Sequence, residues 1–222
     1  MLLNDIKILK EMDHPNILRT YECYEDDSKL TLVTDVVKGR DLIDEIIARG
    51  KFDEVDCAKV MKIVLSCIAY CHEKHITHRD LRPENILINS KQGKDTIKIL
   101  DFGTSLPYRD GKGGRSTPYY TAPEALNDCG SSKSDIWSIG VICYTLLSGL
   151  NLFNGESEEQ VCAKIRKGKF DFDSEVWLNM SHSCKDFIIH LLTFKPEDRV
   201  TAEQALLHPW LRDSPTPDGD DT

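Results

Sequence analysis

Carboxylate, amide and guanidinium side chains gather in one short stretch near the middle of the chain, which reads His78-Arg79-Asp80-Leu81-Arg82-Pro83-Glu84-Asn85. Asp80 could accept the proton of a substrate hydroxyl and orient its oxygen for in-line attack. Asn85 offers an amide oxygen, a hard ligand of the kind that Mg²⁺ prefers beside phosphate oxygens. Arg82 adds a fixed positive charge where a transferred phosphoryl group would lie. These residue types suit phosphoryl transfer, which needs positioning and charge neutralisation more than covalent chemistry.

Further motifs follow in a fixed order. They are Asp101-Phe102-Gly103, Ala122-Pro123-Glu124, Asp135-x-Trp137-Ser138-x-Gly140 and a single Arg199. Asp101 supplies a second oxygen ligand from a different loop than Asn85, so two metal ions could be held from opposite sides. One tripeptide alone would carry little information, whereas the ordered set indicates one catalytic site.

Periodic segments must position these motifs. Hydrophobic periodicity predicts helices over 2–12, 41–48, 54–74, 133–148, 157–167, 182–193 and 201–207, and strands over 17–24, 29–37, 85–88 and 96–100. Residues 25–28 read as a hairpin turn between the first two strands. The glycine-rich stretch 101–121 reads as a long functional loop, and the Pro/Asp/Gly-rich tail is expected to be disordered.

Composition narrows the class of protein. A net charge of −9 over 222 residues disfavours nucleic acid and anionic membranes as partners. We find no apolar run long enough to cross a membrane and no signal peptide at the start of the sequence. None of the eight cysteines forms a C-x-x-C pair, so we expect buried, reduced thiols and not a zinc or redox site. We therefore expect a cytoplasmic location, with the nucleus as a second compartment.

The motif set resembles that of eukaryotic-type serine/threonine protein kinases from Leu2 to about Leu211. The resemblance implies an α+β kinase fold with a partial N-lobe of one helix and a β-hairpin over 1–37, a complete and mainly helical C-lobe over 38–211, and a disordered tail over 212–222. Arg82–Asn85 and Thr117–Tyr120 resemble the serine/threonine class and not the tyrosine class.

Other stretches are similar to the calmodulin-dependent and calcium-dependent kinases. They are Asp13–Ile17, Gly168–Phe172 with Trp177, and Ala202–Leu206 leading to His208-Pro209-Trp210. This group suggests protein substrates that carry a basic residue, above all arginine, before the acceptor serine or threonine. Glu84 and Asp41 are the acidic groups expected to meet that residue.

The resemblance also implies site residues and the cofactors ATP and Mg²⁺. The catalytic set is Asp80, Arg82, Asn85, Asp101 and Thr117; the nucleotide-binding set is Thr34, Asp35, Val37, Asp41, Glu84 and Leu87; the metal ligands are Asn85 and Asp101. Thr34 would gate the pocket behind the adenine, whose edge would meet the backbone of Asp35 and Val37.

Structural roles are implied for a further set. The column that links the two lobes is matched by His78, Phe102, Leu9 and the more polar Thr20. A buried ion pair is matched by Glu124 and Arg199. Asp135 matches the residue that binds the catalytic-loop backbone, and Arg79 matches a phosphate-binding arginine.

The sequence departs from the family pattern before its first predicted helix, where no glycine-rich loop and no lysine strand precede it. Asp5 stands at the usual glutamate position, and Arg82 replaces the loop lysine. Two interpretations remain open. One is a fragment of a true kinase, nearly inactive alone, which the intact Asp80, Asn85 and Asp101 favour. The other is a pseudokinase that acts as a protein-interaction module; an unrelated helical protein fits poorly.

Overall fold

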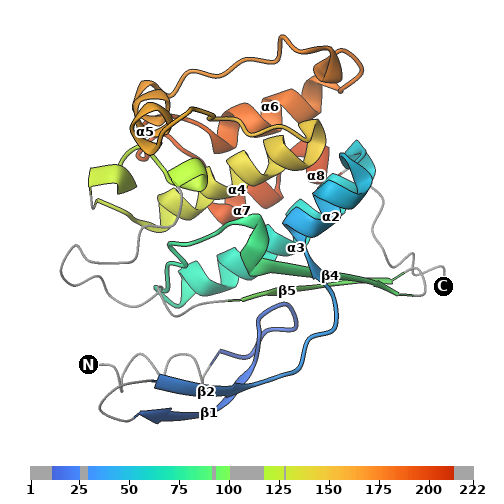
Figure 1. Cartoon of the computed structure of the whole chain (residues 1–222), viewed down its shortest axis with the longest axis vertical. Coiled ribbons are helices and arrows are strands. Elements are labelled where there is room, and N and C mark those ends of the chain that lie inside the picture. The colour runs from blue at the N-terminus through green and yellow to red at the C-terminus, as the bar shows by residue number, and fades with distance from the viewer. Residues whose placement is uncertain (1–11, 26–29, 92–93, 101–117, 128, 213–222) are drawn as a thin grey trace.

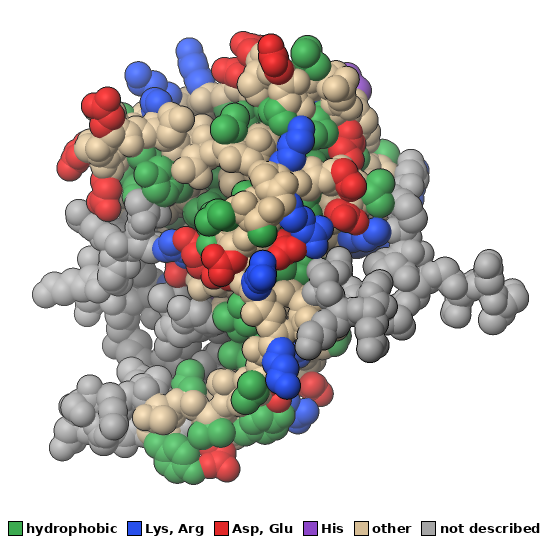
Figure 2. All heavy atoms as spheres, turned by 45° about the vertical axis from the view of Figure 1, so that its right-hand side comes forward, with side chains coloured by type: hydrophobic (Ala, Val, Ile, Leu, Met, Phe, Trp, Pro, Cys, Tyr) green, Lys and Arg blue, Asp and Glu red, His purple; other side chains and the backbone are tan. Residues whose placement is uncertain are grey.

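The computed structural model describes residues 12–25, 30–91, 94–100, 118–127 and 129–212 (Figure 1). The first two strands form the expected hairpin, with β1 over Thr20–Glu25 and β2 over Leu30–Thr34 paired antiparallel. Large hydrophobic side chains of this hairpin and its exit are exposed, namely Tyr21, Tyr24, Leu32, Val33 and Val36. Figure 2 shows the corresponding hydrophobic cluster at the bottom of the molecule. The helix expected over 2–12 lies almost wholly outside the described residues.

A second sheet has the strand order β3-β4-β5, with β3 over Arg40–Asp41, β4 over Ile86–Lys91 and β5 over Lys94–Ile99. The inward positions of β4 and β5 carry isoleucines that are at most 3% exposed. Strand β3 was not expected, because two residues are too few to show a period. Gly39 permits it: a Cβ at this position would lie 2.7 Å from the carbonyl oxygen of Ile88.

The predicted helices in the described part of the chain are confirmed to within two residues at each end. They are α2 (Leu42–Arg49), α3 (Glu54–Glu73), α4 (Ser132–Ser148), α5 (Glu158–Lys167), α6 (His182–Leu191) and α7 (Ala202–Leu206), and a short α8 (Pro209–Arg212) adds to them. Each of the six longer helices begins after a side chain that accepts a hydrogen bond from its first turn. These caps are Asp41, Asp53, Ser131, Ser157, Ser181 and Thr201.

Helix α4 is the centre of the helical body and packs against α3 and α6 (Figure 1). All its residues from Ser134 to Ser148 are buried, as expected for a helix that is apolar on every side. The Trp137 ring stacks on Phe153 with 5.9 Å between centroids. The motif residues Asp135 and Ser138 therefore lie on a helix that is buried over most of its length.

The segment Asn16–Leu18 joins the hairpin to the second sheet. The Ile99 amide donates to the Asn16 carbonyl at 2.7 Å, and the Leu18 amide donates to the Ile99 carbonyl at 3.1 Å. The α+β fold expected from the sequence is thus confirmed. Among the described residues, no helix combines the length and the apolar character that a membrane crossing requires.

Candidate active site

Asp135 of α4 holds the backbone of the loop that carries Asp80. Its Oδ2 accepts the His78 amide at 2.9 Å, and its Oδ1 accepts the Arg79 amide at 2.9 Å. His72, in the last turn of α3, lies 2.8 Å from the same Oδ2 through its Nε2. Arg79 adopts a left-handed backbone conformation with φ of 71°, which is unfavourable for a residue with a Cβ. The Asp135 carboxylate therefore stabilises a strained turn directly before Asp80.

His78 connects this loop to the start of the next motif. The ring is fully buried, with Nε2 2.9 Å from the Leu100 carbonyl, while Nδ1 accepts the Asp80 amide at 3.3 Å. A carbonyl can only accept, so Nε2 carries the proton and the ring is the neutral tautomer. His78 thus sets the position of Asp80 relative to Leu100, the residue before Asp101.

Asn85 and Asp80, both in the predicted catalytic set, lie together. The Asn85 amide nitrogen donates to the Asp80 carbonyl at 2.8 Å and to its Oδ2 at 3.2 Å. This orientation directs the amide oxygen away from Asp80 and leaves it as the group of Asn85 suited to Mg²⁺. The Leu100 amide donates to the Asn85 carbonyl at 2.8 Å, so Leu100 lies beside Asn85. The donor set fits a magnesium–phosphate site.

Arg82 and Glu84 form an ion pair within the loop, around a short 3-10 turn at Pro83–Asn85. The Arg82 Nε donates to Glu84 Oε2 at 2.9 Å, and a second guanidinium nitrogen donates to Oε1. The hydrogen bond from Arg82 holds the pKa of Glu84 below its ordinary value, and the bond to Glu84 raises the pKa of Arg82. Two residues assigned separate roles from sequence are therefore partners.

Two of the predicted nucleotide-binding residues, Asp41 and Leu87, are directly opposite each other on β3 and β4. The Asp41 carboxylate also accepts the Asp44 amide at 2.8 Å and so caps α2. One carboxylate oxygen of Asp41 is therefore committed to the helix, whereas the other accepts no hydrogen bond from a described residue and could meet a ribose hydroxyl or a basic side chain. The capping role was not foreseen.

The predicted hinge begins at Thr34, the last residue of β2, whose hydroxyl lies 3.3 Å from the Asp35 carbonyl. The Asp35 amide donates to the Arg19 carbonyl at 3.1 Å, and its carboxylate accepts the Tyr21 hydroxyl at 2.5 Å. Val37 is half-buried between β2 and β3. Asp35 is thus anchored to Arg19 and to Tyr21 of β1, and its amide is engaged within the protein.

Several predicted residues lie outside the described part of the chain. They are Asp101 and Thr117 of the catalytic set, with Asp5, Leu9 and Phe102. The remaining members of the lobe-linking column, His78 and Thr20, are buried.

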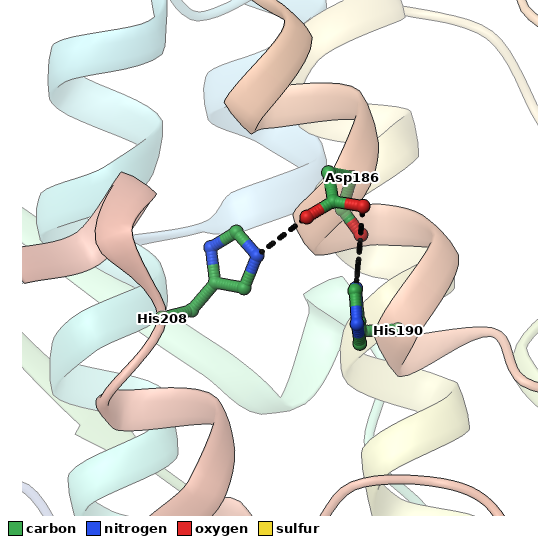
Figure 3. A group of neighbouring side chains, drawn as sticks. All are labelled: Asp186, His190 and His208. Atoms are coloured by element: carbon green, nitrogen blue, oxygen red, sulfur yellow. Dashed lines mark hydrogen bonds and ion pairs between the residues drawn. The ribbon is translucent and has the colours of Figure 1, made fainter.

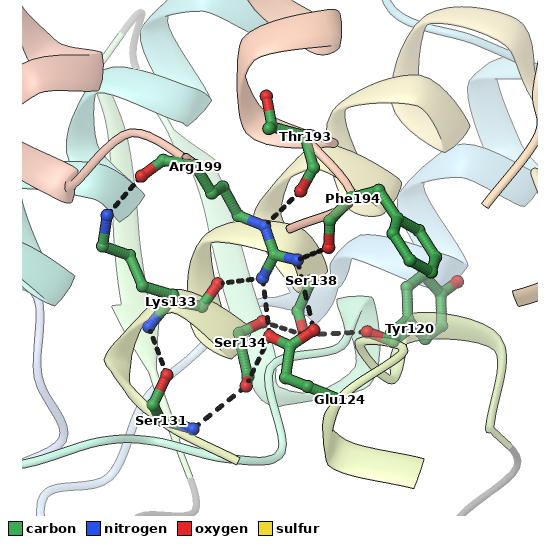
Figure 4. A network of polar contacts seen from close by, with 9 residues as sticks. All are labelled: Tyr120, Glu124, Ser131, Lys133, Ser134, Ser138, Thr193, Phe194 and Arg199. Carbon is green, nitrogen blue, oxygen red and sulfur yellow. Dashed lines mark hydrogen bonds and ion pairs between the residues drawn. The ribbon is translucent and has the colours of Figure 1, made fainter. Parts of the chain in front are cut away.

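Glu124 and Arg199 form the buried ion pair expected from the motifs (Figure 4). Arg199 donates to Glu124 Oε1 at 2.7 Å and Oε2 at 3.2 Å, and to the carbonyls of Lys133, Thr193 and Phe194 at 2.6–3.1 Å. Burial alone would raise the pKa of Glu124, but the hydrogen bonds and charge of Arg199, with other hydrogen bonds, lower it overall. Ser138 donates to the Tyr120 carbonyl at 2.8 Å, which fixes the segment after Thr117 on α4.

A second cluster of titratable side chains, Asp186, His190 and His208, joins α6 to α8 (Figure 3). These types suit a transition metal, but His208 uses both ring nitrogens. Its Nδ1 accepts the Trp210 amide at 3.2 Å, so its Nε2 carries a proton and donates to Asp186 at 3.2 Å. No lone pair is left on His208 for a metal, and the cluster is structural.

Sequence reasoning missed His72 and Tyr120. His72 supports Asp135 across 63 residues, and nothing in its neighbourhood on α3 distinguishes it from a surface histidine. Tyr120 lines a narrow cavity of about 20 Å³ together with Asp80 and Arg82. Its place in the motif Thr117–Tyr120 was the available signal.

Comparisons with known proteins agree with this geometry. The family described as protein kinase domain matches residues 1–211. Calcium-dependent protein kinase 5 of Plasmodium falciparum (isolate 3D7) is 42% identical over 214 residues, which cover 95% of this chain and 38% of the relative. Calcium-dependent protein kinase 4 of Plasmodium berghei (strain Anka) is 44% identical over 215 residues, or 95% of this chain and 41% of the relative. The chain thus spans about two fifths of the length of these curated relatives.

Proposed function

This chain belongs to the protein kinase family, and from that premise we propose that it transfers the γ-phosphoryl group of ATP to serine or threonine residues of proteins. The observation that carries the proposal is the pairing of Asp80 with Asn85, on a loop that Asp135 holds at 2.9 Å through two backbone amides. A base and a metal ligand fixed in this way are the parts that phosphoryl transfer needs.

In this proposal Asp80 accepts the proton of the substrate hydroxyl, while Asn85 and Asp101 hold Mg²⁺. The bound ion would neutralise charge on the phosphates. Arg82 contributes positive charge beside the base, and the Thr117 hydroxyl binds Asp80. ATP lies against Leu87, with its adenine edge on the backbone of Asp35 and Val37 behind Thr34, and its ribose near Asp41 and Glu84.

The proposed substrates carry arginine a few residues before the acceptor. Glu84 keeps 36% of its side chain exposed although it pairs with Arg82, and a substrate guanidinium could share its oxygens. The second carboxylate oxygen of Asp41, which accepts no hydrogen bond from a described residue, offers a further acidic contact. No nucleic acid or membrane partner is part of the proposal, and the free cysteines of the described residues favour the cytoplasm, with the nucleus second.

One observation favours the alternative, a pseudokinase that binds partners without phosphorylating them. The Arg82 guanidinium is engaged by Glu84, so this cation is not free to meet a phosphoryl group unless the pair opens. If the pair does not open, the protein would bind partners without phosphorylating them.

Radiolabelled phosphoryl transfer to a serine peptide with an arginine before the acceptor separates the two functions. The full-length protein is compared with Asp80→Asn and with the control Asp173→Asn, an exposed aspartate away from the loop. The kinase proposal expects Asp80→Asn to lower kcat by about 10²–10⁴-fold, the size of a general-base contribution, and the control to match wild type. Equal activity in Asp80→Asn would refute it, and the absence of turnover in all three with retained peptide binding would support the pseudokinase.

A further inference from the structure

A groove of about 790 Å³ shares no residue with the catalytic loop. Its walls are α2, the C-terminal end of α4 with the segment 149–154, and α5 with residues 169–171. The chain leaves α4 and runs back across this helix to reach α5, so the groove lies where three segments converge (Figure 1). Volumes of this order accommodate sizeable ligand groups.

One wall is apolar. On α2, Leu42 and Ile46 are buried in the core, while Ile43 and Ile47, one turn apart, form a second ridge that lines the groove. Ile47 is 75% exposed, and Leu150 on the adjoining segment is 51% exposed. Two exposed aliphatic side chains in the lining of one groove suit a partner's apolar face.

The opposite wall is basic. Lys164, Lys167 and Lys169 line it and are exposed. None of the three takes part in an ion pair with another described residue, and the Lys164 ammonium donates only to the Asn154 side chain, at 3.0 Å, among those residues. Asp171 is the one acidic residue in the lining. This local positive charge is opposite in sign to the net charge of −9 of the whole chain.

We propose that this groove docks an acidic amphipathic helix of a protein partner. The apolar face of that helix packs on Ile43, Ile47 and Leu150, and its glutamates or aspartates face the lysines of α5. Helix-in-groove recognition uses this pattern of anchors at i, i+3, i+4 and i+7. A basic helix would meet three ammonium groups, so charge complementarity selects the acidic one.

The groove is connected to the site through α4. The Thr145 side chain lines the groove and interacts with the Tyr120 side chain, and Tyr120 lines the cavity beside Asp80 and Arg82. A partner docked in the groove is therefore close to the catalytic loop while leaving it accessible. The docking does not depend on the proposed phosphoryl transfer.

A pair of synthetic helical peptides tests the proposal. Both have about 18 residues, or five turns, with leucines at the four anchor positions; one carries glutamates and the other lysines on the flanking face. Fluorescence anisotropy with the full-length protein should show the glutamate peptide binding at least about tenfold more tightly, with an affinity that falls as salt rises. Equal binding of the two peptides would overturn the proposal.

Charge reversal locates the binding site. The double variant Lys164→Glu/Lys167→Glu should lower the affinity for the glutamate peptide by about tenfold and raise the affinity for the lysine peptide. The matched control, Lys185→Glu/Lys195→Glu, makes the same charge change outside the groove and should leave both affinities unaltered. Ile47→Asp should lower the affinity for both peptides, because both use the apolar contact. No effect of either groove variant would show that the peptides bind elsewhere.

A second copy of this chain is the competing occupant. Sedimentation of the protein alone measures its oligomeric state. A dimer that Ile47→Asp dissociates would overturn the proposal of a distinct acidic partner, whereas a monomer that binds the glutamate peptide supports it.

Discussion

The carboxylate of Glu84 accepts two hydrogen bonds from the guanidinium of Arg82, two residues earlier on the same loop. An arginine from a substrate must share or displace this internal arginine to reach Glu84. Glu84, which we propose binds an arginine of the substrate, is therefore already paired with Arg82. Under that proposal, selectivity at Glu84 would reflect a competition between two guanidinium groups.

Replacing Glu84 by Gln tests this competition. We expect the preference for an arginine peptide over its alanine analogue, measured as a ratio of kcat/KM values, to fall by roughly tenfold, because one charge-assisted contact is lost. The control Glu175→Gln removes an exposed carboxylate elsewhere and should retain the preference. An unchanged ratio in Glu84→Gln would mean that Arg82 alone uses this carboxylate.

Replacing Arg199 by Met should destabilise the helical body strongly. The substitution leaves the Glu124 carboxylate and three carbonyls without their buried donor. Breaking a buried pair from one side costs about 3–5 kcal/mol, so urea unfolding should show a loss of that order. The double variant Arg199→Met/Glu124→Leu should recover part of it, since no charge is then left unpaired. A loss below about 1 kcal/mol in the single variant would contradict the assignment.

The Glu124–Arg199 ion pair should also make the free energy of unfolding depend on pH. The folded-state pKa of Glu124 lies below its ordinary value of 4.5, so its carboxylate form is favoured by folding. The contribution is fully present above pH 4.5 and is lost as the pH falls through the folded-state pKa. The difference in free energy of unfolding between wild type and Glu124→Gln should therefore be constant near neutrality and narrow in acid. A difference that widens as the pH falls would have the wrong sign.

His75 offers a stabilising substitution. It follows the end of α3 with φ of 59°, and the amides of His75 and Ile76 donate to the carbonyls of His72 and Cys71. This is a Schellman ending, in which glycine is the favoured residue at the left-handed position. His75→Gly should raise the free energy of unfolding by about 1 kcal/mol because the Cβ penalty is removed. Lys74→Gly, where φ is −87°, should lower it; equal effects would contradict this account.

The helices could be predicted from the sequence because the signals that define them are local. Asp53, Ser131 and Ser157 each precede a helical period and cap the helix that follows. The loop around Asp80 could also be proposed as a site, since its polar residues lie within an eight-residue stretch. The contact that supports this loop could not be predicted from the sequence, because His72 meets Asp135 across 63 residues and no local pattern encodes the contact.

Two other features escaped prediction for a related reason. Strand β3 exists only through its pairing with β4, because two residues have no period of their own. The groove combines Ile47 with Lys164, which are more than 100 positions apart in the sequence. Sequence reasoning proposed residues for the chemistry from their types and spacing, while the contacts that orient them, such as Arg82 with Glu84, depend on the folded backbone.

The three tryptophans of the chain, Trp137, Trp177 and Trp210, are all buried in the helical body. The β1–β2 hairpin contains exposed Tyr21 and Tyr24 and no tryptophan. Intrinsic indole emission is therefore a reporter of one part of this fold: it shifts to longer wavelength when the helical body opens to water and stays unchanged when the hairpin alone detaches.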